Sequence, residues 1–494
     1  MGVLCRIDRD GEPRFLLPVL QLRTILKEPS LGDMEDSLHG LSHSLSEAFE
    51  ETIARIQSLS PNQRRIGMSA LLYLVHARRP IAFDELSDLL AIHPGRRQVA
   101  PKYRPAPRTL LECCQGLVTI DARTGDVRTS HHSIQEYLME NDERLFPRAE
   151  AILAVNCLSY LLLEDFADGP WETEEEVESH IDSYPFLEYA TRFFGNHAKP
   201  SEGDPDVQAE LARFFASRPA MAVANQVRQY AMGRRREYWG PDEGLSFTPL
   251  HYAARHGLTQ TVSRLLDQGV FDVNIATKQG ATPIIHAASN GHAHVVRTLL
   301  ERGADPYLRN WYGDALHCAV ESNKAGSIRE LVRWGMNPSG PGGPARRYMD
   351  CALDGDAAAA LEALVQLGVD IHAEKACFRD GEEVAGCYSL PIFFQACDLG
   401  CEKIVGLMLD HGWVDVNAKS VPDGRTGLHW AARGRCLGVV RKLLDAGADV
   451  HAVDGDGMPA LQLMREKFRA STLRAVLGSG IWDGRYAMDA KREG

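Results

Sequence analysis

Cysteine is the residue of this sequence whose type and spacing could hold a metal ion. Eleven cysteines are scattered over 494 residues. Cys113 and Cys114 are adjacent, and Cys397 lies close to Cys401, but neither arrangement supplies the two paired thiolates of a structural zinc site. We therefore predict free, mostly buried thiols in a reducing compartment, with no metal and no cofactor. This favours an intracellular protein of the cytoplasm, with the nucleus as the alternative compartment.

Nucleophilic catalysis would need a serine or cysteine activated by a neighbouring base. The pentapeptide at 40–44 (Gly-Leu-Ser-His-Ser) fails the G-x-S-x-G nucleophile elbow at its last position. Pairing Cys113 with His131 or His132 is conceivable, but the sequence offers no third residue to orient the base. We therefore predict that the chain is not an enzyme.

A repeated motif dominates the C-terminal half of the sequence. Thr-Pro-Leu-His-Tyr-Ala-Ala at 248–254 returns as Thr-Pro-Ile-Ile-His-Ala-Ala at 282–288 and as Thr-Gly-Leu-His-Trp-Ala-Ala at 426–432. Weaker copies begin at Asp314, Arg347, Leu390 and Met458. The histidines at the fourth motif position are His251, His317 and His429. Their recurrence at one repeat position predicts structural hydrogen bonds rather than metal binding.

The residue types of the motif predict a pair of short helices followed by a turn. Threonine can accept a hydrogen bond from a free N–H at a helix start, and proline fits the first helical turn. The apolar pairs at 295–296 and 299–300 give the second helix one apolar face. Gly303 and Gly447 can adopt the left-handed conformation that ends a helix. One such unit cannot bury its own apolar face, so stacked neighbours must stabilise it.

These copies resemble the ankyrin-repeat family over about 240–482, because the first two begin 34 residues apart, close to the ankyrin period of about 33. The copy at Arg347 has lost Thr-Pro, and an insertion around 374–386 precedes the next copy. Met458–Ile481 resembles a divergent capping repeat. The resemblance implies a solenoid that binds other proteins through its concave face and its hairpin fingertips.

The fingertips of this solenoid hold the candidate partner-binding residues. Trp311 and Tyr312 stand just before Gly313, where a hairpin turn is expected, and aromatic residues are common in interface hot spots. Packing of this pair against the neighbouring fingertip is the alternative interpretation. The full candidate set is Lys278, Gln279, Trp311, Tyr312, Asp423 and Arg425.

A different pattern precedes the repeats. Gln63–His76, Asp84–Ile92 and Arg108–Gln115 have the pattern of three helices, the second capped by Asp84. The runs at 117–120 and 127–130 predict a hairpin. Three helices followed by a hairpin is the order of a winged helix.

Several short segments between about 15 and 200 carry a second resemblance. They are Phe15–Leu17, Leu20–Leu22, Arg79–Ile81, Leu117–Asp121, His132–Leu138 and Tyr184–Ala190 with Phe193, Phe194 and His197. These segments resemble the region after the NTPase core of fungal NACHT–ankyrin proteins. The resemblance implies a helical remnant of the NTPase module, a winged helix of the type named after GPI inositol-deacylase, and a helical connector. It also implies a sensor or scaffold role for the repeats.

The phosphate-binding loop of that NTPase, G-x-x-x-x-G-K-[ST], has no match in this sequence. We therefore expect no ATP binding. Within the resemblance, the chain is either part of a longer protein whose upstream region holds the NTPase or a stand-alone adaptor.

We predict a mainly α protein in which a winged-helix domain and a helical connector precede an ankyrin-repeat α-solenoid. The predicted segments are 1–55 (helical remnant), 56–140 (winged helix), 141–239 (connector), 240–482 (about six to seven ankyrin repeats) and 483–494 (tail). No apolar run is long enough to span a membrane. The predicted function is non-catalytic recognition of other proteins.

Nucleic-acid binding through the winged helix is the alternative function. A basic cluster around the third predicted helix would supply phosphate contacts; its members are Arg96, Arg97, Lys102, Arg104 and Arg108. Three prolines interrupt this cluster, and the helix itself offers the apolar run at 110–114. A net charge of -13 also disfavours binding of polyanions by the whole chain.

Overall fold

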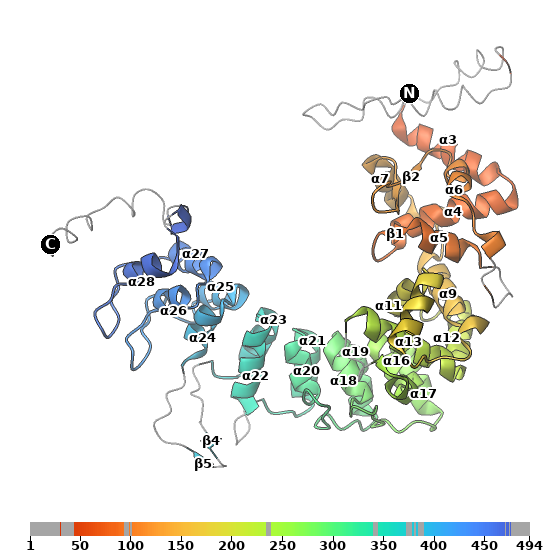
Figure 1. Cartoon of the computed structure of the whole chain (residues 1–494). Helices are drawn as coiled ribbons and strands as arrows, with labels where there is room; N and C mark the ends of the chain where they lie inside the picture. Colours follow the sequence, from red (N-terminus) through yellow and green to blue (C-terminus); the bar gives the residue numbers. More distant parts are fainter. Residues whose placement is uncertain are drawn as a thin grey trace. The chain divides into compact units, whose positions relative to one another are not determined.

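The computed structural model describes the chain as two compact units that divide between Pro249 and Leu250 (Figure 1). The described residues are Ser30, 44–92, Gln98, 101–233, 239–338, 344–371, 378–379, 382–383, 390–469, 471–473 and 475. Several predictions fall outside them: the helical remnant before Ser44, most of the Gly-Leu-Ser-His-Ser pentapeptide, Arg96, Arg97 and the tail at 483–494.

The first unit contains the predicted winged helix. Its elements in chain order are α4 (Pro61–His76), β1 (Ile81–Ala82), α5 (Phe83–Leu90), α6 (Pro107–Cys113), β2 (Val118–Ile120) and β3 (Asp126–Thr129). The predicted hairpin is β2–β3, in which Thr119 pairs with Arg128. Strand β1 was missed, and it pairs antiparallel with β3 to complete a sheet of order β1-β3-β2.

Helix α5 begins one residue earlier than predicted, and Asp84 does not cap it. The N-terminal cap is Ala82, where the short strand β1 ends. The carboxylate of Glu85 accepts a hydrogen bond from the Ala82 N–H at 2.9 Å and is held by the guanidinium of Arg79. The missing strand explains the error, because β1 fixes where the chain can turn into the helix.

Helices surround the winged helix and continue as the predicted connector. They are α3 (Leu45–Ser58), α7 (His132–Glu140), α8 (Asp142–Leu145), α9 (Ala149–Leu161), η2 (Glu164–Phe166), α10 (Glu174–Ser183), α11 (Leu187–Ala198), α12 (Pro205–Ala216), α13 (Arg218–Ala231) and α15 (Pro241–Ser246); a short 3-10 turn, η1 (Pro101–Tyr103), precedes α6. Helix α9 packs against α11 and α12, and the fully buried rings of Tyr160, Phe186 and Phe194 fill the core.

The second unit is a stack of helix pairs (Figure 1). The inner helices are α16 (Pro249–His256), α18 (Pro283–Asn290), α20 (Ala315–Glu321), α22 (Pro344–Asp354), α24 (Ile392–Leu399), α26 (Gly427–Arg433) and α28 (Ala460–Lys467). The outer helices are α17 (Thr259–Asp267), α19 (Ala293–Glu301), α21 (Ala325–Arg333), α23 (Ala358–Gln366), α25 (Glu402–Asp410) and α27 (Leu437–Asp445). From α18 onward each inner helix packs against the next inner helix, and from α17 onward the outer helices do the same.

The predicted apolar face of α19 is buried, since Val295, Val296 and Leu299 are fully inaccessible to solvent. The predicted threonine cap is not formed at Thr282, which makes no side-chain capping bond at the start of α18. At the start of α20 an aspartate, Asp314, is the cap and accepts from His317 N at 2.9 Å. Carboxylate caps of this kind satisfy one of the free N–H groups of a helix start.

Side chains also cap helices across repeat boundaries. Asn323 accepts a hydrogen bond from Ala360 N of α23 at 2.8 Å, and Asp356 accepts from Ile404 N of α25 at 2.9 Å. Both acceptors have positive φ (56° and 46°), the left-handed conformation that asparagine and aspartate tolerate better than most residues. These bonds join neighbouring repeats in addition to their apolar contacts.

The degenerate copy at Arg347 still forms a helix pair, α22 and α23, whose Met349, Leu361 and Leu364 are fully buried. Of the predicted insertion at 374–386, the described residues are Phe378–Arg379 and Glu382–Glu383. They form the short antiparallel strands β4 and β5.

Candidate interaction surface

The motif histidines stabilise the stack. His251 is buried and its Nε2 donates to the carbonyl of Ala281 at 3.1 Å, and burial lowers its pKa to about 4. His429 Nε2 donates to the carbonyl of Met458 at 3.0 Å, while its Nδ1 accepts from Thr426 N at 3.2 Å. The predicted hydrogen-bonding role is thus present at two of the three positions.

His317 differs from this pattern. Its Nε2 lies 3.9 Å from Cys351 Sγ, and its buried Nδ1 makes no hydrogen bond. Burial raises the pKa of the Cys351 thiol to about 11, so this thiol is protonated at neutral pH and is a poor nucleophile. The described residues contain no group of three His, Cys, Asp or Glu side chains placed to hold a metal ion.

Trp311 and Tyr312 occupy a turn that Asn310 and Gly313 close. Asn310 N donates to Gly313 O at 3.0 Å, and the Asn310 side chain accepts from the N–H groups of Tyr312 and Gly313, each at 2.9 Å. The polar groups of the turn are therefore satisfied locally. Trp311 is 64% exposed and Tyr312 is 41% exposed.

Lys278 and Gln279 occupy the preceding turn, which a hydrogen bond from Gly280 N to Thr277 O closes at 2.8 Å. Gly280 has a φ of +79°, and a Cβ added to it would lie 3.0 Å from the carbonyl oxygen of Arg309. The two successive fingertips are therefore in close contact along their backbones. Lys278 is exposed and Gln279 is half-buried.

Asp423 and Arg425 lie on a third fingertip and stabilise the stack itself. The Asp423 carbonyl accepts from Gly455 N of the next fingertip at 2.8 Å. Arg425 Nε lies 3.5 Å from Asp454 Oδ2, and its guanidinium lies over the ring of Trp430. The structure therefore brings the predicted contact residues together only as two neighbouring fingertips, with this pair on a separate one.

The sequence interpretation did not select Arg309 and Arg347, which are both exposed. Arg309 directly precedes the turn that carries Trp311, and Arg347 lies in the first turn of α22 in the next repeat. Burial lowers the pKa of His317, and the positive charges of Arg347 and Arg309 lower it further, so both guanidinium groups lie near this histidine. The sequence does distinguish Arg347, because this arginine replaces the threonine at the start of the repeat motif.

Of the basic cluster predicted for the winged helix, the structure describes Lys102, Arg104 and Arg108, and the two arginines form ion pairs within the fold. Arg104 pairs with the fully buried Asp88, its Nε donating to Oδ1 at 2.8 Å, and Arg108 pairs with Glu112 at 2.7 Å. Lys102 lies over the ring of Tyr103.

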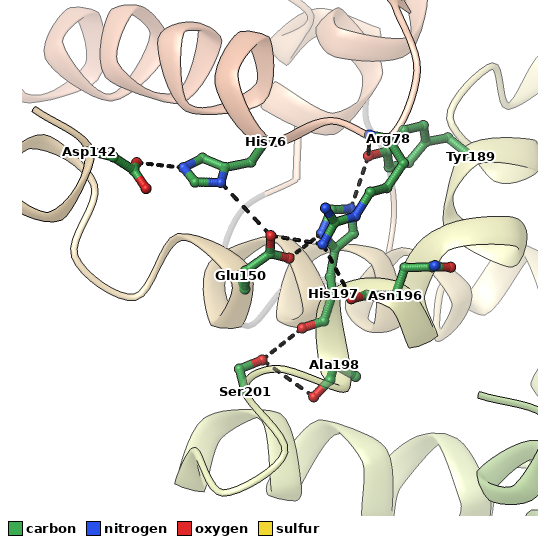
Figure 2. Close-up of polar contacts among 9 residues, drawn as sticks. All are labelled: His76, Arg78, Asp142, Glu150, Tyr189, Asn196, His197, Ala198 and Ser201. Carbon is green, nitrogen blue, oxygen red and sulfur yellow. Dashed lines mark hydrogen bonds and ion pairs between the residues drawn. The ribbon is translucent and has the colours of Figure 1, made fainter. Parts of the chain in front are cut away.

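A polar network joins the winged helix to the connector within the first unit (Figure 2). At its centre Glu150 of α9 accepts from His197 Nδ1 of α11 at 2.7 Å and from Arg78 NH2 at 2.8 Å. His76, the last residue of α4, lies 3.8 Å from the Glu150 carboxylate and bonds Asp142 at 2.7 Å. The hydroxyl of Tyr189 is 2.9 Å from His197 Nε2, so a neutral His197 with its proton on Nδ1 satisfies both bonds.

The charges of this network follow from its contacts. Burial alone would raise the pKa of Glu150, but hydrogen bonds from His197 and His76 and the charge of Arg78 outweigh it and lower the pKa to about 2. Glu150 and Asp142 raise the pKa of His76, whereas burial lowers the pKa of His197. The network therefore connects α4, α9 and α11 through hydrogen bonds and ion pairs.

A pocket of ≈ 480 Å³ lies beside this network, between α4, β1, β3 and α7. Its three arginines are paired: Arg78 with Glu150, Arg79 with Glu85 and Arg128 with Asp126. None of these three arginines is therefore left unpaired to bind an anionic ligand in the pocket.

Two protein-family models match the chain. Ankyrin repeats match in three copies, at 229–310, 250–341 and 348–454. The GPI inositol-deacylase winged helix domain matches at 56–152. Both predicted modules are confirmed, and with them the resemblance to the NACHT-associated architecture.

Curated relatives share parts of this chain. Azaphilone pigments biosynthesis cluster protein L of Monascus ruber is 27% identical over 316 residues, which are 57% of this chain and 64% of that protein. The E3 ubiquitin-protein ligase KEG of Arabidopsis thaliana is 23% identical over 269 residues, 47% of this chain and 16% of that protein. The chain thus covers less than two thirds of either relative.

Among solved structures, the human ASB11 ankyrin repeat domain aligns with a TM-score of 0.35 at 25% identity. The alignment covers 47% of this chain and 96% of that chain.

Within the described part of the chain, the helices are too short or too polar to cross a membrane.

Proposed function

For a chain that joins a winged-helix domain of the GPI inositol-deacylase type to ankyrin repeats, we propose a non-catalytic role in protein recognition. The partner is bound by the fingertips and the adjoining inner helices of the stack. The observation that carries this proposal is the exposure of Trp311 and Tyr312 on one fingertip, at 64% and 41%.

Turn positions are normally polar because they face water. Asn310 and Gly313 already satisfy this turn, so large aromatic rings are not needed to close it. Exposed aromatic area contributes little to the stability of an isolated chain, whereas buried tryptophan and tyrosine dominate binding hot spots. The ankyrin matches support the same role, because stacked repeats present an extended binding surface.

The test is replacement of both rings by alanine in the full chain. We expect Trp311→Ala with Tyr312→Ala to weaken partner capture by ~2 kcal/mol or more, a typical hot-spot loss, with an almost unchanged melting temperature. Partners are captured from lysate with each variant and quantified by mass spectrometry. Trp334→Ala is the matched control, since Trp334 is 51% exposed at the end of the outer helix α21.

Unaltered capture together with a melting temperature several degrees lower would assign the pair to the stabilising contacts of the stack. The proposed surface would then be wrong.

A further inference from the structure

We propose that the partner segment bound by this stack is an acidic, extended peptide. It would place carboxylates on Arg309 and Arg347 and an apolar side chain against Trp311. These residues, with Tyr312, are called the fingertip surface below. The inference rests on the proposed recognition function and adds the chemistry of the partner.

The first step is the free charge on this surface. Arg309 and Arg347 are both exposed, and among the described residues neither forms an ion pair. Some other arginines of the stack are paired: Arg297 bonds Glu330 at 2.7 Å, and Arg433 bonds Asp398 at 2.6 Å. A planar guanidinium with open donors is suited to bind a carboxylate through two parallel hydrogen bonds.

The second step is the position of the two arginines relative to each other. Tyr348, which follows Arg347 in α22, donates to Asp314 at the start of α20, and Arg309 directly precedes the Asn310–Gly313 turn that leads into α20. The two arginines therefore belong to neighbouring repeats, near the starts of α20 and α22, and both lower the pKa of His317. Asp314 already caps α20 through His317 N at 2.9 Å and accepts from Tyr348 OH at 3.4 Å. This carboxylate is thus engaged within the fold, whereas Arg309 and Arg347 are exposed.

The third step is the apolar anchor. Arg309 lies in the same turn as Trp311, so a segment that bonds the guanidinium also passes the exposed indole. An extended peptide advances about 3.3 Å per residue, so a segment of about ten residues is long enough to follow successive fingertips. Carboxylates spaced around an apolar residue match this arrangement.

A protein segment fits the surface better than a nucleic acid. A nucleic acid would bring a continuous row of phosphates, and its affinity would need many cations. The fingertip surface offers two unpaired arginines, and the exposed carboxylate of Glu321 ends α20, one helical turn after His317. Phosphates beyond the first contacts would meet this negative charge.

The experiment selects random 12-residue peptides displayed on phage against the full chain. Enriched peptides are synthesised and their affinities measured by fluorescence anisotropy. We expect enrichment of peptides rich in Asp and Glu around an apolar residue, with affinity that falls as salt is raised. Arg309→Gln with Arg347→Gln should weaken binding about tenfold or more, since charge-assisted hydrogen bonds are lost.

Arg329→Gln is the matched control, because Arg329 lies on the outer helix α21 and bonds Gln366 at 3.1 Å. It should leave peptide affinity unchanged. All variants should keep the melting temperature of the unmodified chain, since Arg309 and Arg347 are exposed and Arg329, which is half-buried, forms no ion pair among the described residues.

The outcomes separate the inference from the function beneath it. If Trp311→Ala with Tyr312→Ala abolishes peptide binding but the two arginine changes do not affect it, the proposal of an acidic partner is wrong. The proposed recognition surface would still stand. Peptides indifferent to all four changes would contradict both. Enrichment of neutral or basic peptides, no enrichment at all, or tighter binding of a 12-nucleotide single strand than of any acidic peptide would overturn the inference.

Discussion

Two tryptophans show how one residue type serves different purposes in the same stack. Trp430 is 5% exposed, its Nε1 donates to Ser420 Oγ at 3.0 Å, and the Arg433 guanidinium lies 4.1 Å from its ring centroid. Trp311 is 64% exposed on a turn. The first follows the motif histidine on an inner helix, and the second lies between repeats. Position within the repeat therefore determines whether the ring is buried in the fold or exposed to solvent.

Glu150 is the residue on which the polar network of the first unit depends. Glu150→Gln should lower stability by ~1–3 kcal/mol, because it removes the charged acceptor of the fully buried His197. Thermal unfolding of the full chain measures the effect. Glu188→Gln is the control, since Glu188 forms an exposed pair with Arg192 on α11, and exposed pairs contribute little.

The same network predicts how stability depends on pH. The pKa of Glu150 is lowered to about 2 in the fold, so its contribution is present above its ordinary pKa near ~4.3 and is lost as pH falls toward 2. The pKa of His197 is also lowered, so stability begins to fall below about 6.5. The raised pKa of His76 acts in the opposite sense, since its contribution is lost as pH rises. Glu150→Gln should flatten the acid limb below pH 5, and an unchanged limb would contradict this assignment.

At the scale of elements, the repeats are joined by caps that a single repeat does not contain. Asp356 follows the inner helix α22, yet it accepts from Lys403 N at 3.0 Å and from Ile404 N at 2.9 Å in the next repeat. Asn323 has the corresponding role one repeat earlier. Sequence periodicity predicts the helices but not these bonds, because each acceptor and its donors lie in different repeats, 37 residues apart for Asn323 and 47 and 48 for Asp356.

Removal of the cap at Asp356 should loosen the start of α25. Asp356→Ala should cost ~1–2 kcal/mol, since it removes the acceptor and places alanine at a positive φ. The amide hydrogens of Lys403 and Ile404 should exchange faster with deuterium. Asp356→Asn should behave almost as the unmodified chain, and Asp356→Gly should show the same faster exchange with a smaller loss of stability. Equal exchange in all three variants would refute the cap.

The winged helix is expected to fail as a DNA-binding element. Arg104 is engaged with Asp88, which is fully buried and also accepts from Tyr160 OH. Arg104→Ala should therefore destabilise the chain, because it leaves a buried carboxylate without its cation. The unmodified chain should not retard a random duplex at physiological salt, and a steep salt-dependent shift would contradict this expectation.

For the whole molecule, the sequence predicted the fold class, the order of the two modules and the helix pairs of the stack. These features depend on local periodicity and on a motif repeated many times. Strand β1 was missed because two residues give no period, and its pairing with Val127 is non-local. The apolar fingertip residues were identified from their place in the repeat. Arg347 was interpreted as decay of the motif, because its proximity to Arg309 appears only when repeats stack.

The stack is also expected to fold without the first unit. Each repeat contacts only its neighbours, so residues 240–482 should retain the helix content and exchange protection that they have in the full chain. Within it, 345–388 should open faster than 281–305, because the copy at Arg347 has lost the Thr-Pro start and precedes the insertion. Hydrogen–deuterium exchange of the fragment and of the full chain measures both points. Uniform protection would mean that Met349, Leu361 and Leu364, all fully buried, couple this repeat to its neighbours as strongly as an intact motif does. Loss of helix in the fragment would mean that the stack depends on contacts outside its own repeats.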